Sequence, residues 1–185
     1  MTTQALYKEL NYVNHSREKR QFYANLVISQ PELLPQLIEI LLMVNDKISP
    51  RAAWVIEFFC NDNLEKFIPY SNDFLPNLKH IKLDSALRPC AKICEYIAKA
   101  YFGKEESKVK TLLTNTQKEI IIEACFDWMI TEQKVAVKAY AMHTLFLFGK
   151  EFDWIYPELR IILERDFSTQ SAAFKARARH ILKKI

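Results

Sequence analysis

The amino-acid sequence predicts an all-α fold of stacked helix pairs, and three observations carry that prediction. Half of the 185 residues are apolar and about a quarter are charged, which is typical of a chain with a packed core. Only two residues are glycine, too few for the turns of most sandwich and nucleotide-binding folds. A ten-residue segment recurs: residues 136–145 and 173–182 are identical at six positions and lie 37 residues apart. A period of this size is typical of helical repeat arrays.

The N-terminal residues predict a pair of helices. Residues 2–13 carry apolar side chains at spacings of three and four, with Thr2 or Thr3 as a possible N-cap. Ser16 can cap a second helix that runs to about residue 29, and Pro31 then interrupts the chain. We expect residues 1–30 to form an atypical capping pair, followed by about four repeats over residues 31–185.

A proline motif predicts where the first helix of each later pair begins. Leu34-Pro35 is followed by Leu75-Pro76, 41 residues on, and by Tyr156-Pro157, 81 residues further. The missing copy should lie near Gln117, where Gln replaces proline. Proline is tolerated in a first helical turn, because its absent N–H has no partner there. Each copy therefore predicts the start of a first helix, here called an A helix.

A basic residue followed by small residues predicts the second, or B, helix of each pair. Arg51, Arg88, Lys138 and Lys175 stand at these places, separated by 37, 50 and 37 residues. The polar insert at residues 103–108 explains the longer middle interval and is expected to be a loop.

These motifs resemble the HEAT/armadillo-like family of α-α repeats, in its bacterial HEAT-like form, over residues 31–185. The resemblance implies one domain over residues 1–185, folded as a right-handed α-α superhelix of about four to five HEAT-like helix pairs. It also implies that B helices line the inner wall. In the family an acidic residue often precedes the basic one in the turn, and Asp46 and Asp84 occupy this place.

The basic residues of the B helices are candidates for binding a partner. They can line a groove on the inner wall, or they can pair with turn acids and backbone carbonyls. The same two possibilities apply to the basic C-terminus, where residues 133–185 contain 10 Lys/Arg and 5 Asp/Glu. That cluster can bind an anionic partner, or it can stabilise a helix C-terminus. The candidate partner-binding residues are Arg51, Arg88, Lys138, Lys175 and Arg179.

No motif predicts catalysis, a metal or a cofactor. His143 and His180 occupy equivalent repeat positions, which favours a role in packing over one as a general base. Cys90 and Cys94 supply only half of a metal site, so buried thiols are expected at all four cysteines, Cys60, Cys90, Cys94 and Cys125. Reduced cysteines and the lack of a signal peptide favour a cytoplasmic protein with no membrane segment.

The expected function is that of a non-catalytic scaffold that binds another protein. The alternative is a nucleic-acid-binding protein similar to the HEAT-like alkylpurine DNA glycosylases, for which Trp54, Arg88, Asp127 and Trp128 would be the residues of interest. Against it, residues 1–132 contain 16 basic and 17 acidic residues, whereas phosphate binding needs a strongly basic stripe. Core packing is the simpler expectation for the tryptophans, Trp154 included.

Overall fold

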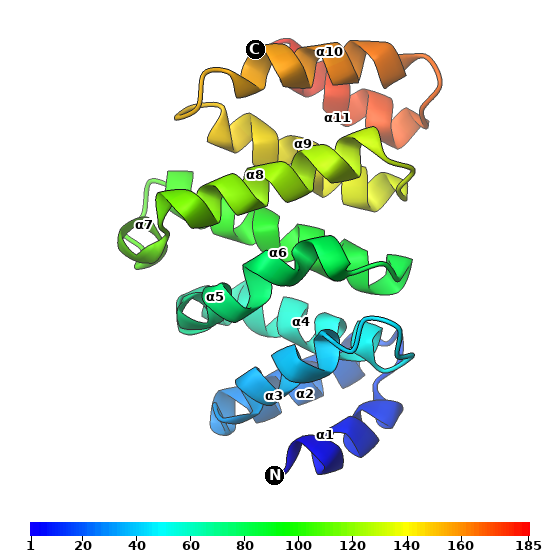
Figure 1. The fold of residues 1–185 in the computed structure, drawn as a ribbon, viewed down its shortest axis with the longest axis vertical. Coiled ribbons are helices and arrows are strands. Elements are labelled where there is room, and N and C mark those ends of the chain that lie inside the picture. Colours follow the sequence, from blue (N-terminus) through cyan, green and yellow to red (C-terminus); the bar gives the residue numbers. More distant parts are fainter.

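The computed structural model describes all 185 residues and shows helices only, arranged in two rows (Figure 1). The A row comprises α1 (Thr3–Glu9), α3 (Leu33–Leu41), α5 (Ser71–Phe74), α8 (Asn115–Ile130) and α10 (Ile155–Phe167). The B row comprises α2 (Arg17–Ser29), α4 (Ser49–Phe67), α6 (Asp84–Phe102), α9 (Val135–Phe148) and α11 (Ala172–Leu182). The A row lies in front in Figure 1. The all-α superhelix of stacked helix pairs is therefore confirmed.

Each B-row helix packs on the next one along the chain. Helix α2 contacts α4, α4 contacts α6, α6 contacts α9, and α9 contacts α11. Shorter helices fill the connections: η1 (Leu10–Tyr12), η2 (Ile68–Tyr70), η3 (Leu75–His80) and α7 (Val109–Leu112). The predicted loop at residues 103–108 separates α6 from α7. No helix is both long and apolar enough to cross a membrane.

Side-chain caps fix the beginnings of four helices. The Thr2, Ser16, Thr114 and Ser171 side chains each accept a backbone N–H from the first turn of α1, α2, α8 and α11. At Thr114 the Gln117 side chain completes a capping box by accepting from the Thr114 N–H. The predicted caps at Thr2 and Ser16 are confirmed.

The prediction that each proline motif begins an A-row helix is confirmed for two of the three copies. Pro35 and Pro157 each occupy the third position of an A-row α-helix. The prediction is wrong for Pro76, which lies in the 3₁₀ helix η3 after the single turn of α5. Pro69 and Pro76 stand close together, and each lacks the N–H that a continuous α-helix would need. The Asn77 side chain instead donates to the Asp73 carbonyl at 2.8 Å.

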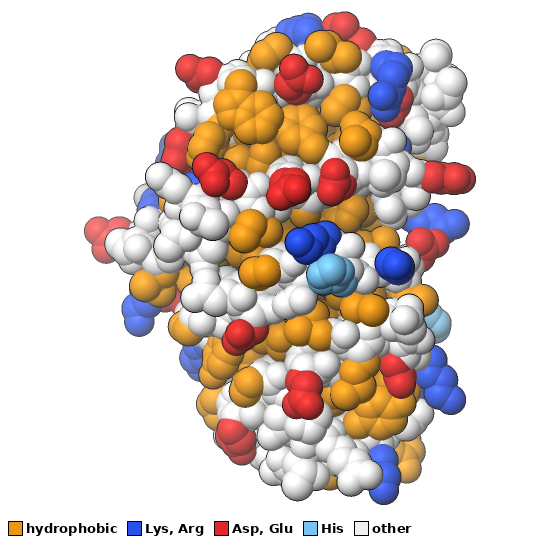
Figure 2. Space-filling model, in the orientation of Figure 1, with side chains coloured by type: hydrophobic (Ala, Val, Ile, Leu, Met, Phe, Trp, Pro, Cys, Tyr) orange, Lys and Arg blue, Asp and Glu red, His pale blue; other side chains and the backbone are white.

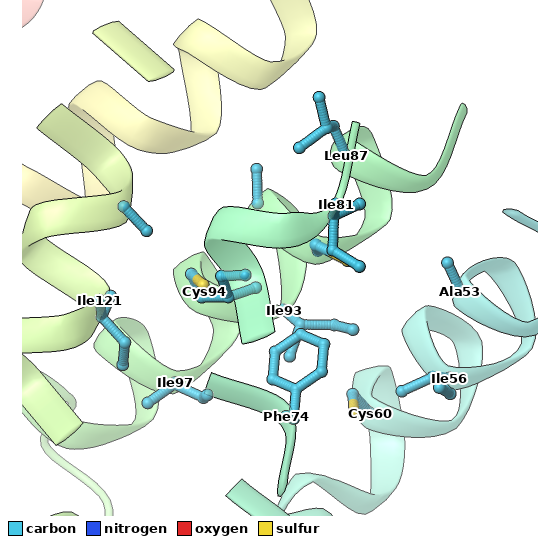
Figure 3. Close-up of a cluster of buried hydrophobic side chains, with 14 of the residues drawn as sticks. Ala53, Ile56, Cys60, Phe74, Ile81, Leu87, Ile93, Cys94, Ile97 and Ile121 are labelled. Carbon is cyan, nitrogen blue, oxygen red and sulfur yellow. The ribbon is translucent and has the colours of Figure 1, made fainter. Parts of the chain in front are cut away.

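One apolar core runs the length of the array. Its 55 buried residues form a single cluster that extends from Leu6 to Ile181. Figure 3 shows how the short third A unit contributes: Phe74 points between Cys60 of α4 and Ile93 of α6. All four cysteines are buried free thiols, as expected. Trp54 and Trp128 are also buried, but the prediction for Trp154 is wrong.

Trp154 lies outside the core because it precedes α10, on the A-row surface. It is 53% exposed, and its ring stacks on that of Phe126 of α8 at a centroid distance of 5.7 Å. Stacking on one neighbour leaves the other face of the indole in solvent.

Candidate functional site

The two rows of helices carry opposite charge. The B-row helices contain 12 Lys/Arg and 6 Asp/Glu, a net charge of +6. The A-row helices together with η3 contain 5 Lys/Arg and 9 Asp/Glu, a net charge of −4. Figure 2 shows the A-row face, where acidic side chains cross the molecule at the level of α8. Exposed acids of α8 recur there every four residues, at Glu119, Glu123 and Asp127. The B-row surface, here called the B face, is therefore the side that attracts anions.

A buried carboxylate organises the C-terminal half of the B face. The Glu95 side chain of α6 is 1% exposed, and its oxygens contact four nitrogen-bearing side chains. These are Lys92 at 2.9 Å, Lys99 at 3.2 Å, His143 of α9 at 2.7 Å and Arg177 of α11 at 3.3 Å. Three stacked helices thus meet at one side chain.

The pKa of Glu95 reflects this environment. Burial opposes ionisation, but hydrogen bonds from His143 and Lys92 and the charges of Lys92 and Lys99 outweigh it, and they lower the pKa to about 2. Glu95 is therefore ionised throughout the physiological range, and it holds the surrounding cations in place.

A second buried acid lies in the N-terminal half of the B face. Glu57 of α4 is 6% exposed and accepts from the Arg88 guanidinium of α6 at 3.2 Å. Burial raises the pKa of Glu57, although the charges of Arg88 and Arg20 partly offset that effect. The negative charge of Glu57 is thus less well compensated than that of Glu95. Arg20 and Arg88, whose charges act on it, are partly exposed to solvent.

Aromatic rings alternate with these cations. The Arg20 guanidinium lies 4.7 Å from the Trp54 ring centroid and 5.7 Å from that of Phe58. The Lys92 ammonium lies 4.4 Å from the Tyr140 ring and 5.0 Å from the Tyr96 ring. Cation–π contacts of this kind hold long basic side chains against the surface.

Three pockets adjoin the exposed side of α6. The largest, about 620 Å³, lies beside the second half of α4 and is lined by Asn61, Asn63, Tyr96, Lys99 and Lys108 among others. A smaller one of about 210 Å³ lies above Glu57 and includes Arg17, Gln21 and Tyr96. The third, about 420 Å³, lies between α6, α9 and α11 and is lined by Glu95, Lys99, His143, Arg177 and His180 together with small and apolar residues.

Four of the predicted partner-binding residues have partners within the chain. Arg51 donates to the carbonyls of residues 10 and 11, at 3.1 and 2.6 Å, and Arg88 pairs with Glu57. Lys138 is 6% exposed, donates to the Met129 carbonyl at 3.0 Å, and lies 3.9 Å from Asp166. Lys175 donates to the Ser168 carbonyl at 3.0 Å. Of these four, Arg88 stands on the B face beside the buried acid.

The fifth predicted residue, Arg179, is exposed near the end of α11, with its guanidinium 5.6 Å from the Phe167 ring. The two acidic residues that the family resemblance assigns to the turns do not pair with these basic residues. Asp46 accepts from the Tyr7 hydroxyl at 2.9 Å, and Asp84 lies 3.7 Å from Lys134. Whether Arg51, Arg88, Lys138, Lys175 and Arg179 bind a partner stays a prediction.

Sequence reasoning missed Glu95 and most of its partners. One signal was present: Lys92 and Glu95 are the only charged residues in the run from residue 89 to residue 98. His143 and His180, assigned to packing by their repeat position, both line the pocket above Glu95.

The residues of interest for the glycosylase-like alternative fall into separate rows. Trp54 and Arg88 belong to the B row, on α4 and α6. Asp127 and Trp128 belong to α8 of the A row, where Asp127 is exposed and Trp128 is buried. The fold does not bring these four side chains to one face.

The chain is an α-α superhelical repeat protein, because its helices form two rows stacked around one core. The basic residues and the three pockets lie on the B face. A family model described as the HEAT repeat domain matches residues 6–185, and the chain therefore belongs to the HEAT repeat family. Neither the search of curated proteins nor the search of solved structures found a match.

Proposed function

We propose that this HEAT repeat protein is a non-catalytic scaffold whose B face binds an acidic segment of a protein partner. The observation that carries the proposal is the arrangement of charge on that face. Its two central acids, Glu57 and Glu95, are buried beneath basic side chains, so mainly cations meet an approaching partner.

The basic side chains are held in fixed positions, which suits recognition. Arg88 is anchored by Glu57, Arg20 rests on Trp54 and Phe58, and Lys92 rests on Tyr140. Anchoring reduces the side-chain entropy that binding would otherwise cost. An extended acidic segment that crosses the B row would meet Arg20 on α2, and Arg88 and Lys92 on α6.

The chemistry of the pockets supports a non-catalytic role. The His143–Glu95 pair is the only arrangement on the B face that resembles a general base with an orienting acid. Its pocket is lined by no Ser, Thr or Cys that could act as a nucleophile. The four cysteines are buried, and burial raises the pKa of each thiol, which opposes formation of a reactive thiolate.

Nucleic acid is the second candidate, and one observation favours it. Aromatic rings alternate with arginine and lysine along the B face, as in surfaces on which bases stack beside phosphates. An acidic protein segment is preferred because the B-row helices have a net charge of only +6, whereas binding along a phosphate backbone needs a strongly basic stripe.

Fluorescence anisotropy with two labelled probes separates these functions. The probes are a peptide of alternating Glu and Gly, and single-stranded DNA of equal charge, each at ~50 and ~200 mM salt. We expect the peptide to bind, and Arg20→Ala/Arg88→Ala to weaken its binding by roughly tenfold.

The matched control removes two exposed cations outside the B-row helices, through Lys79→Ala/Lys82→Ala, and should leave peptide affinity unchanged. Tighter binding of DNA than of peptide would favour the second candidate. Loss of affinity in the control variant, or no binding of either probe, would contradict a role for the B face.

A further inference from the structure

The Glu95 cluster, which borders the pocket between α6, α9 and α11, contains more positive charge than its carboxylate neutralises. Lys99 and Arg177 line the pocket itself, and Lys92 contacts Glu95 from outside the lining. Lys92, Lys99 and Arg177 contribute three positive charges around the single negative charge of Glu95, which leaves +2 before any histidine is protonated. These cations are partly exposed to solvent, and an anion placed between them would relieve their mutual repulsion. The cluster is therefore short of negative charge.

Several N–H donors of the residues that line the pocket are not used by Glu95. Arg177 uses Nη1 for Glu95 and for the Ala139 carbonyl, at 3.3 and 3.1 Å, and its Nη2 and Nε make no other hydrogen bond. The Lys99 ammonium contacts Glu95 alone, with two further N–H groups available. His180 is exposed and makes no side-chain hydrogen bond.

Small side chains on α11 make room for a ligand in front of these donors. Ala173 and Ala176 line the pocket on the α11 side, and its volume is about 420 Å³. Larger residues there would bring α11 side chains over Lys99 and His143. A tetrahedral anion can thus approach a guanidinium, an ammonium and two imidazoles together.

We propose that this pocket binds a phosphate monoester carried by a side chain of the protein partner, an inference that rests on the proposed function of the B face. A phosphorylated side chain carries about −1.5 to −2 charges at neutral pH, which matches the surplus of +2. Its three oxygens suit the arginine fork and the lysine ammonium. A carboxylate or a phosphodiester brings one negative charge and would leave the cluster half neutralised.

Glu95 acts as a positioning residue in this account. Its carboxylate fixes one nitrogen each of Lys92, Lys99 and Arg177 within 3.3 Å, so cations that would otherwise repel one another converge on one place. The receptor is thereby assembled before the phosphate arrives, which lowers the cost of binding.

Isothermal titration calorimetry on the full chain tests the proposal with five probes. Three of the probes are versions of one short Gly-rich peptide, with phosphothreonine, threonine or glutamate at its centre. The others are inorganic phosphate and a single-stranded oligonucleotide with a 5′-phosphate. We expect the phosphopeptide to bind roughly tenfold more tightly than the glutamate peptide, because it adds charge-assisted hydrogen bonds.

Two variants avoid the risk of misfolding, because the side chains they remove are exposed. Lys99→Ala and His180→Ala should each reduce phosphopeptide affinity by about three- to tenfold. Lys104→Ala, which removes an exposed cation from the loop after α6, is the matched control and should change nothing. Equal effects of the control and the pocket variants would overturn the assignment.

The remaining outcomes separate this inference from the proposed function. Equal affinity for the phosphothreonine and glutamate peptides overturns the phosphate pocket but leaves the B face as a site for acidic segments. Inorganic phosphate that binds as tightly as the phosphopeptide overturns the assignment to a protein side chain. Tightest binding of the oligonucleotide overturns it in favour of nucleic acid. Binding of none of the probes contradicts both the pocket and the proposed function.

Discussion

Gly149, at the end of α9, is in direct contact with the ring of Tyr156 from α10. A Cβ atom on Gly149 would lie 2.1 Å from Cε1 and 2.4 Å from Cδ1 of that ring, far inside van der Waals contact. We expect Gly149→Ala to lower the free energy of unfolding by about 1–3 kcal/mol in a urea titration, because α9 and α10 must move apart.

The cause can be checked by a double-mutant cycle with Tyr156→Ala. Without the ring, the added methyl group has space, so the cost of Gly149→Ala should fall to a few tenths of a kcal/mol. An equal cost in both backgrounds would show that the ring contact is not the reason for glycine at this position.

Glu95 should make the free energy of unfolding depend on pH in the acidic range. Its pKa is lowered from 4.5 to about 2 in the folded chain, so its stabilisation is complete above pH 4.5 and is lost as the pH falls toward 2. The corresponding contribution is about 3 kcal/mol at neutral pH. We expect Glu95→Gln to be less stable at pH 7 and to show a shallower loss of unfolding free energy between pH 5 and about 2, followed by circular dichroism in urea.

Glu57→Gln is the matched control for that measurement. Burial raises the pKa of Glu57, so its ionised form is disfavoured by folding, and its contribution changes with pH in the opposite sense. The acid-induced loss of stability should remain as steep as in the unmodified chain, or become steeper. A shallower curve in this variant would mean that Glu95 is not the dominant acid.

At the scale of the element, α6 is joined to its neighbour α4 by an unusual hydrogen bond. Pro89 lies inside α6 and has no N–H for the Ser85 carbonyl four residues earlier. The indole N–H of Trp54, on α4, donates to that carbonyl at 2.8 Å. A helix-breaking residue in one repeat is thus compensated by a side chain of the previous repeat.

This compensation predicts coupling between Trp54 and Pro89. We expect Trp54→Phe to cost about 1–3 kcal/mol of unfolding free energy, because the Ser85 carbonyl loses its donor. In a Pro89→Ala background the backbone N–H of residue 89 can serve that carbonyl, so the same substitution should cost less. Additive effects of the two substitutions in thermal unfolding would rule the compensation out.

The helices could be predicted from sequence because their determinants are local. Caps such as Ser16, the prolines at 35 and 157, and the duplicated segment each act within one turn or one repeat. The third A unit was predicted as a helix like the others, since its proline motif matches theirs. It is broken because Pro69 is close enough to Pro76 to interrupt the same helix.

The Glu95 cluster could not be predicted, because its members are distant in the sequence. His143 lies 48 residues and Arg177 lies 82 residues from Glu95. Only the stacking of α6, α9 and α11 brings them together, and that depends on the rotation of each helix about its axis. A single charged residue on a mostly apolar helix indicates burial, but it does not indicate its partners.

At the scale of the whole molecule, stability should be greatest in the middle of the array. Helices α4, α6 and α9 each pack between two B-row neighbours, whereas α2 and α11 have a neighbour on one side only. In a one-dimensional stack the ends therefore open first. We expect amide hydrogen exchange to be slowest in α4, α6 and α9 and fastest in α1, α2 and α11. Uniform protection would indicate one all-or-none unit.

The division of charge between the two rows leads to the most direct test of the account, an NMR titration of the ¹⁵N-labelled chain with the Glu–Gly peptide. If the B face is the binding surface, amide shifts will concentrate in α2, α4, α6 and α11, and those of α3, α8 and α10 will stay unchanged. Shifts concentrated in the A-row helices, with the amides of the B-row helices unchanged, would contradict binding at the B face.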